Sequence, residues 1–107
     1  MISSDYIRGY NDLIILSLLK EEDSYAYLIS KKIKEKTKEK YIIKETTLYS
    51  TFTRLEKNNY IESYSLNIQS GGNQRIYYKI TKDGLKYLEE KIIEWKVTKS
   101  VVDDFVK

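Results

Sequence analysis

The hydrophobic pattern changes its period once, at Tyr60, and this change limits the fold more than any other feature of the sequence. Up to that point the apolar residues recur at helical spacing, and beyond it residues 61–68 alternate between two faces, as in a strand. The segment SGGNQ follows, and its two glycines between apolar-rich runs predict a hairpin. The next run, RIYYKI, is rich in aromatic and β-branched residues and predicts the returning strand.

Three helices are predicted before the hairpin. Residues 11–19 are densely apolar, as in a helix buried on most sides, and residues 24–38 form a second helix that Asp23 or Ser24 caps. Residues 45–58 form a third helix, which Thr46 or Thr47 caps and which Asn58 and Asn59 end. The apolar sides of the second and third helices are predicted to be Tyr27, Leu28, Ile29 and Ile33 in one and Leu48, Phe52 and Leu55 in the other.

A last helix is predicted over residues 82–106, with Thr81 as its cap and Asp83 in its first turn. At 1.5 Å per residue it would be about 37 Å long, which is more than its own small domain can cover. Two apolar strips run along this helix. One strip could be buried by packing on the first helix, and the other could be buried by a second copy of the chain. The predicted dimer interface is Leu85, Leu88, Ile92, Trp95, Val102 and Val106, and the second strip is Ile93, Val97, Val101 and Phe105.

The predicted fold is therefore mainly α with a small β-hairpin. Residues 1–80 would form a winged helix-turn-helix domain, in which the hairpin is the wing. Residues 81–107 would form a C-terminal dimerisation helix that packs with the helix of residues 5–20.

The composition argues against an enzyme. The 107 residues include no cysteine and no histidine, which excludes disulfides, thiolate nucleophiles and Ser-His-Asp triads. The paired carboxylates at residues 21–22, 89–90 and 103–104 fall in segments that read as solvent-facing, so we expect neither a metal site nor a cofactor. No apolar run is long enough to span a membrane and no signal peptide is visible, so we expect a cytoplasmic protein with no membrane partner.

The charge distribution points to the middle of the chain as the part suited to a polyanion. Residues 24–80 carry eleven Lys and Arg against five Asp and Glu, whereas residues 1–23 carry two against five and residues 81–107 carry six of each. A helix fits the DNA major groove, and the non-core side of the third helix (residues 45–54) is rich in hydroxyls. The predicted DNA contacts are Lys44, Thr46, Thr47, Tyr49, Ser50, Thr53 and Arg54, with Asn73, Gln74 and Arg75 at the wing.

An ordinary polar helix surface is the alternative for this face, but it would more typically carry Glu and Lys pairs. Four threonines within residues 46–53 favour a contact surface, because threonine is a poor choice for an exposed helix. The predicted function is sequence-specific binding of double-stranded DNA, with a protein-interaction module as the alternative, since a fold alone does not fix a function.

The sequence resembles the PadR family of transcriptional regulators, in the shorter subgroup with a single C-terminal helix. The segments that carry the resemblance are TLYSTFTRLEKNNYIES, SGGNQRIYYKITKDGLKYL and SYAYLISKKI, together with Trp95 in the last helix. The resemblance implies a dimeric, usually repressing regulator, in which Tyr49 contacts the DNA backbone and Arg75 serves at the wing. Because the dimer predicted from the last helix has two recognition helices, we expect it to bind a palindromic operator. The sequence departs from the family pattern at Ala26, where glycine is usual, and at Asn73 and Gln74, where a basic residue and a proline are frequent.

Trp95 has two interpretations. A large aromatic residue in this helix suits a core or interface anchor. Some PadR-like proteins bind flat aromatic ligands at the dimer interface, so the resemblance also implies Trp95 as one wall of a pocket for a small aromatic effector.

Overall fold

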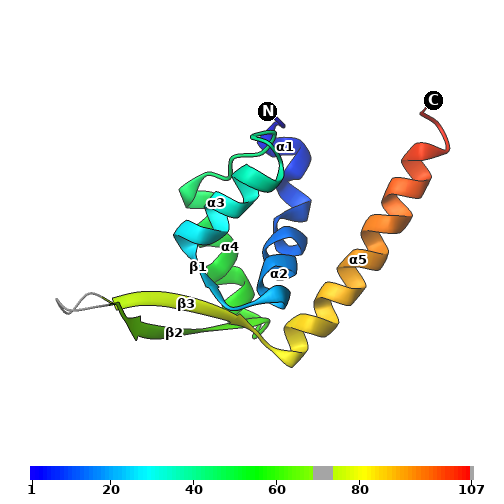
Figure 1. The fold of residues 1–107 in the computed structure, drawn as a ribbon. Coiled ribbons are helices and arrows are strands. Elements are labelled where there is room, and N and C mark those ends of the chain that lie inside the picture. The colour runs from blue at the N-terminus through cyan, green and yellow to red at the C-terminus, as the bar shows by residue number, and fades with distance from the viewer. Residues whose placement is uncertain (69–73, 107) are drawn as a thin grey trace.

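The computed structural model describes residues 1–68 and 74–106 and confirms the predicted order of three helices, a hairpin and a last helix (Figure 1). Two short turns precede them, α1 (Ser4–Ile7) and the 3₁₀ turn η1 (Arg8–Tyr10), so the predicted helix of residues 5–20 is interrupted before Asn11. The remaining elements are α2 (Asn11–Glu21), β1 (Ser24–Tyr25), α3 (Ala26–Lys36), α4 (Glu45–Lys57), β2 (Ile61–Asn67), β3 (Gln74–Ile80) and α5 (Lys82–Asp103). None of the described helices has a stretch that is both long and apolar enough to cross a membrane.

One hydrophobic core joins all the major elements. The predicted stripe of α4 is confirmed, because Leu48, Phe52 and Leu55 are all buried, and Phe52 stacks on Tyr78 of β3 with ring centroids 4.0 Å apart. The helices α2 and α3 contribute Ile15, Leu16, Leu19, Ile29 and Ile33 to the same core. Tyr27 was predicted to join them, but its side chain is 70% exposed, so this prediction is wrong.

Within residues 1–68 and 74–106 the sheet has three strands in the order β1-β3-β2, and both strand pairs are antiparallel. The two-residue strand β1 was not predicted, because two residues are too few to show an alternating period. Ser24 pairs with Tyr78 and Tyr25 with Tyr77, so this segment is held in the sheet and α3 begins only at Ala26. The predicted cap of this helix by Asp23 or Ser24 is therefore wrong: the N-cap is Tyr25, and the hydroxyl of Ser24 is buried with no hydrogen-bond partner among the described residues.

The bounds of α4 agree with the predicted residues 45–58 to within one residue, but the predicted threonine cap is wrong. The helix ends as expected, since Asn59 has a left-handed backbone with a φ of 64°. It starts earlier than a threonine cap would allow, because Glu45 is already helical and the N-cap is Lys44, without a side-chain cap. The buried Ile43 fixes the chain immediately before this start.

The helix α5 begins inside the core and ends outside it. Thr81 caps it as predicted, with its hydroxyl accepting from the Gly84 N–H at 2.9 Å. Gly84 and Leu88 are buried, and the first half of the helix packs on α2, whereas the second half projects away from the body of the molecule (Figure 1). The helix ends at Asp103, three residues before the predicted end.

Candidate nucleic-acid interface

The outward side of α4 is a single polar stripe. Thr46, Ser50, Thr53 and Lys57 are exposed and recur at intervals of four, three and four residues, which places them on one line along the helix. Of the four threonines in residues 46–53, Thr51 belongs to the core and not to this stripe. Lys57 was not among the predicted contacts, although its spacing from Thr53 could have identified it. We call this line the α4 stripe.

Two of the three hydroxyls of the α4 stripe, those of Ser50 and Thr53, already donate to their own helix. Ser50 Oγ donates to the Thr47 carbonyl at 3.1 Å, and Thr53 Oγ1 donates to the Tyr49 carbonyl at 3.0 Å. Their oxygens can still accept hydrogen bonds, and a hydroxyl can rotate to donate when a better acceptor arrives. The stripe can therefore meet donors on base edges without rearrangement and phosphate oxygens after a rotation.

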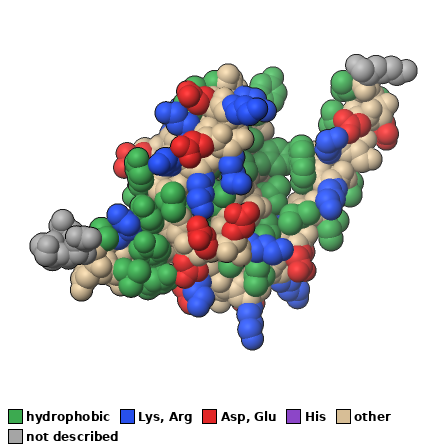
Figure 2. Space-filling model, in the orientation of Figure 1, with side chains coloured by type: hydrophobic (Ala, Val, Ile, Leu, Met, Phe, Trp, Pro, Cys, Tyr) green, Lys and Arg blue, Asp and Glu red, His purple; other side chains and the backbone are tan. Residues whose placement is uncertain are grey.

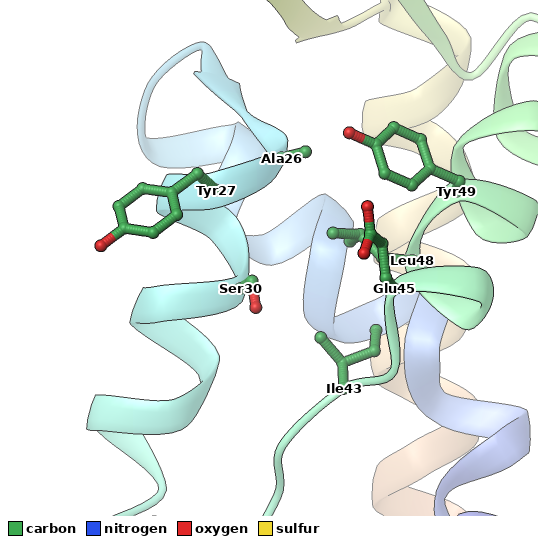
Figure 3. A pocket seen from close by; sticks show the side chains of 7 residues that line it. All are labelled: Ala26, Tyr27, Ser30, Ile43, Glu45, Leu48 and Tyr49. Carbon is green, nitrogen blue, oxygen red and sulfur yellow. The ribbon is translucent and has the colours of Figure 1, made fainter.

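A cavity of about 280 Å³ lies on one flank of the stripe, between α3 and α4 (Figure 3). Figure 3 shows Tyr49 and Glu45 of α4 pointing toward the space between the helices, while Tyr27 of α3 points away from it. The Tyr49 ring packs edge-on against Phe52, with centroids 5.8 Å apart, so its position is set by the core. Tyr49 lies beside the stripe, at the edge of the predicted contact surface.

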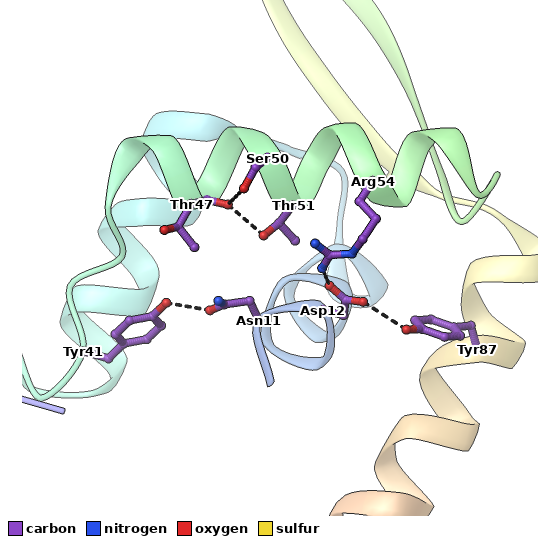
Figure 4. A network of polar contacts seen from close by, with 8 residues as sticks. All are labelled: Asn11, Asp12, Tyr41, Thr47, Ser50, Thr51, Arg54 and Tyr87. Atoms are coloured by element: carbon purple, nitrogen blue, oxygen red, sulfur yellow. Dashed lines mark hydrogen bonds and ion pairs between the residues drawn. The ribbon is translucent and has the colours of Figure 1, made fainter. Parts of the chain in front are cut away.

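On the other flank, Arg54 is bound within the protein and does not extend freely toward solvent. Its guanidinium Nη2 donates to Asp12 Oδ1 of α2, and the Tyr87 hydroxyl of α5 donates to the other oxygen of that carboxylate at 3.0 Å (Figure 4). Sequence reasoning missed this pair because Asp12 and Arg54 are 42 residues apart along the chain. Thr47, also predicted as a contact, is half-buried on this flank and lines a second cavity beside α1.

The wing residues divide into one that is held and one that is exposed. The guanidinium of Arg75 lies 3.9 Å from the centre of the Tyr25 ring, a cation–π contact that keeps it at the base of the wing. Gln74 is exposed at the start of β3, and Asn73 lies outside the described residues. Tyr77 packs between Tyr25 and Tyr64, so the Arg75 contact rests on a row of tyrosines.

The overall surface has mixed charge in the view of Figure 2. Basic and acidic side chains are interspersed there, and hydrophobic side chains gather on the strands of the wing and along α5. Lys44 is exposed immediately before α4 and Lys57 at its end, so a cationic side chain lies at each end of the α4 stripe. These positions suit contacts with phosphates on either side of a groove.

Comparison with known proteins agrees with this geometry. Residues 15–90 match the transcriptional regulator PadR-like family. The chain belongs to the PadR family. A transcriptional regulator from Clostridium thermocellum is 59% identical, covers all of both chains and superposes with a TM-score of 0.92. A PadR family transcription regulator from Clostridium difficile R20291 is 39% identical over 92% of this chain and 100% of that chain, with a TM-score of 0.80. An uncharacterised protein from Lysinibacillus sphaericus is 45% identical over all of this chain and 97% of its own length.

Membership of the PadR family makes the protein a DNA-binding transcriptional regulator and confirms the winged-helix fold. The segment that the resemblance rested on, TLYSTFTRLEKNNYIES, covers most of α4 and the start of β2. It therefore includes Tyr49, Ser50, Thr53 and Lys57, the residues on and beside the outward surface of the helix. All four are exposed.

The predicted dimer residues of this PadR protein fall into two groups. Leu88 is 1% exposed and lies in the core of its own chain, so it is not available to a partner, and its assignment to the interface is corrected. Ile92 is half-buried against the same core, and the Trp95 ring packs edge-on against Tyr10 with centroids 5.2 Å apart. By contrast, the apolar residues left exposed on α5 are Leu85, Ile93, Trp95, Val97, Val101 and Val102, and the exposed Phe105 and Val106 follow the end of the helix.

The Tyr87 hydroxyl is expected to make the stability of this protein depend on pH in the alkaline range. Burial, the hydrogen bond to Asp12 and the charge of Asp12 raise the pKa of Tyr87 from 10.0 to about 12. Because the pKa of the folded state lies above that of the unfolded state, the stabilisation is complete below pH 10 and is lost as the pH rises toward 12. We expect the free energy of unfolding of the wild type to fall more steeply between these pH values than that of Tyr87→Phe. Urea unfolding at several alkaline pH values measures both slopes, and parallel curves would contradict the assignment.

Proposed function

We propose that this PadR-family regulator is a homodimer that represses transcription by binding a palindromic operator. The observation that carries the proposal is the α4 stripe, a line of hydroxyls ending in Lys57 on a helix whose opposite side is core. A helix of this kind fits the major groove, where short hydroxyls can contact base edges and phosphates. Tyr49 at the edge of the stripe and Lys44 before α4 would contact the DNA backbone.

The wing contributes a second point of contact in this proposal. Gln74 is exposed at the start of β3, and Asn73 precedes it in the sequence. Arg75 is half-exposed with its guanidinium above the Tyr25 ring, from where it can approach a phosphate or the minor groove.

The dimer in this proposal forms through the projecting half of α5. Ile93, Val97 and Val101 of α5 and Phe105 just beyond its end follow one another at intervals of four residues, and all are exposed in the single chain. They are the second predicted strip, which takes the place of the predicted interface in this proposal because Leu88 is buried in its own core. A row of large apolar side chains on a projecting helix is poorly suited to water and well suited to a second copy of the same helix. A twofold pair would present two α4 helices to half-sites about one helical turn apart.

Selection of bound duplexes from a random pool tests the proposal directly. We expect an enriched motif with twofold symmetry, and an affinity that falls with salt at a log–log slope of about −0.9 for each phosphate neutralised. A reporter gene placed under the selected motif should be expressed less when the protein is present. Absence of any enriched duplex at low ionic strength would refute the proposal and favour a protein-interaction module, whereas a single asymmetric motif would refute the twofold pairing.

Trp95 has a separate role in the proposal, as one wall of a site for a small aromatic effector. It borders a cavity of about 220 Å³ together with Tyr10 and Leu13, at the point where α5 leaves the core. A flat aromatic compound could stack there on the exposed part of the indole. Saturable quenching of Trp95 fluorescence by a panel of aromatic compounds would support an effector, and an unchanged signal across the panel would leave Trp95 as an anchor of the fold alone.

A further inference from the structure

One carboxylate connects the DNA-facing helix to the long C-terminal helix. Asp12 lies in the first turn of α2, and its two oxygens accept from different elements: Oδ1 from Arg54 of α4 and Oδ2 from Tyr87 of α5 (Figure 4). The Asp12 side chain is only 14% exposed, against 50% for Arg54. The carboxylate is therefore held inside the protein, while part of the guanidinium remains in contact with solvent.

The Tyr87 side of this connection is rigid. The Tyr87 ring stacks on Tyr60 with centroids 4.1 Å apart and an interplanar angle of 11°, and Lys91 Nζ lies 5.3 Å from the centre of the same ring. Tyr60 follows the turn that ends α4, and its carbonyl accepts from the Thr81 N–H at 3.0 Å. Tyr87 of α5 is thus held against Tyr60, next to the end of α4, and its hydroxyl has little freedom to leave Asp12.

Arg54 has N–H donors that its contact with Asp12 does not use. A guanidinium has five N–H donors, and the contact with Asp12 Oδ1 occupies one of its two terminal nitrogens. Releasing Arg54 to a phosphate would leave the Asp12 charge largely desolvated and without its cationic partner, which is costly. Arg54 is therefore expected to stay on Asp12 when DNA binds and to offer its remaining donors to the duplex.

We propose that Asp12 is a positioning residue for DNA recognition, which orients Arg54 on α4 and, through Tyr87, ties that orientation to α5. The inference rests on the proposed function and adds a residue that does not itself touch DNA. A movement of α5 would then change the position of Arg54 through the Asp12 carboxylate. Arg54 would contact a DNA phosphate while Asp12 holds it in place. The sequence predicted Arg54 as a DNA contact, and the inference adds that Arg54 makes this contact while Asp12 holds it.

The conservative variant Tyr87→Phe tests the connection without removing the ring that stacks on Tyr60. We expect its preference for the selected operator over a random duplex to fall roughly threefold to tenfold, the range of one hydrogen bond. In an Arg54→Ala background the same change should have no further effect, because the coupling passes through Arg54. Tyr41→Phe is the matched control: it also removes a tyrosine hydrogen bond to α2, at 2.6 Å to Asn11, but has no contact with Arg54. It should lower stability and leave the preference for the operator unchanged.

A second variant tests the carboxylate itself. Asp12→Asn removes the charge that holds Arg54, and we expect it to bind random duplexes more tightly while losing roughly tenfold or more of its preference for the operator. Asp5→Asn is its control, since Asp5 forms a similar pair with Arg8 at 2.8 Å and the change in net charge is the same. All variants are compared at a temperature where circular dichroism shows them folded.

The outcomes separate this inference from the proposed function. If wild-type protein binds the operator and both Tyr87→Phe and Asp12→Asn keep the wild-type preference, the role of Asp12 is overturned and the proposed function stands. If wild-type protein binds no duplex, both are overturned. Should Asp12→Asn fail to fold, Tyr87→Phe alone decides, since it retains the ring and its packing.

Discussion

Gly84→Ala is expected to lower the free energy of unfolding by about 3 kcal/mol or more, at the upper end of what overpacking costs. A methyl group at this position would lie 2.0 Å from the Tyr60 carbonyl oxygen and 2.9 Å from its carbon, both of them backbone atoms, and 2.8 Å from Ile80 Cγ1. The carbonyl cannot move aside easily because it accepts the Thr81 N–H, so α5 as a whole would have to shift. The higher helix propensity of alanine, about 1 kcal/mol, is too small to offset this.

Gly9→Ala is the control for this substitution. A methyl group there would meet nothing within 4 Å, so only the backbone effect of replacing glycine remains. Urea unfolding of the two variants beside the wild type measures the difference. Equal midpoints for Gly84→Ala and Gly9→Ala would show that the contact between α5 and Tyr60 is looser than described.

The double variant Val97→Glu/Val101→Glu is expected to convert the proposed dimer into a monomer and to weaken operator binding about 10²-fold to 10⁴-fold, through loss of the linked second half-site. Both side chains are more than half exposed in the single chain, at 58% and 53%. Glutamate at these positions should therefore leave the monomer folded and place four like charges at the twofold contact. Mass from light scattering and titration with the operator measure the two effects.

Val97→Leu/Val101→Leu is the matched control, because it keeps the surface apolar and should remain a dimer with wild-type affinity. A glutamate variant that stays dimeric would mean that the partner binds elsewhere on the chain. A monomer that retains full affinity would mean that one copy is sufficient for recognition.

The periodic part of the fold could be predicted from sequence because it depends on neighbours along the chain. The stripe of Leu48, Phe52 and Leu55, the cap at Thr81 and the left-handed Asn59 are local patterns, and the structure confirms each of them. The strand β1 was missed because a two-residue strand is defined by its pairing with β3, about fifty residues further along the chain.

The candidate site was predictable to the same extent. Helical spacing placed Thr46, Ser50 and Thr53 on the outward side of α4, and the structure exposes all three. Spacing could not show that Arg54 is held by Asp12 or Arg75 by Tyr25, because each of these contacts joins distant parts of the chain. Leu88 was assigned to the wrong surface for a related reason: periodicity identifies an apolar side chain, but which surface covers it depends on the packing of α5 on α2.

The close approach of Gly84 to Tyr60 has a geometric consequence for a paired molecule. From Lys82 to Asp103 the helix α5 has 22 residues and is about 33 Å long. A small change in its direction at the first turn, where Gly84 contacts Tyr60, therefore becomes a large displacement at its other end. A tilt of about 5° there would displace the far end by about 3 Å, nearly the rise of one base pair. Substitutions that change the distance between Gly84 and Tyr60 would therefore change the distance between the two α4 helices of a pair. The half-site spacing that the pair prefers would then change while every residue on α4 stays the same.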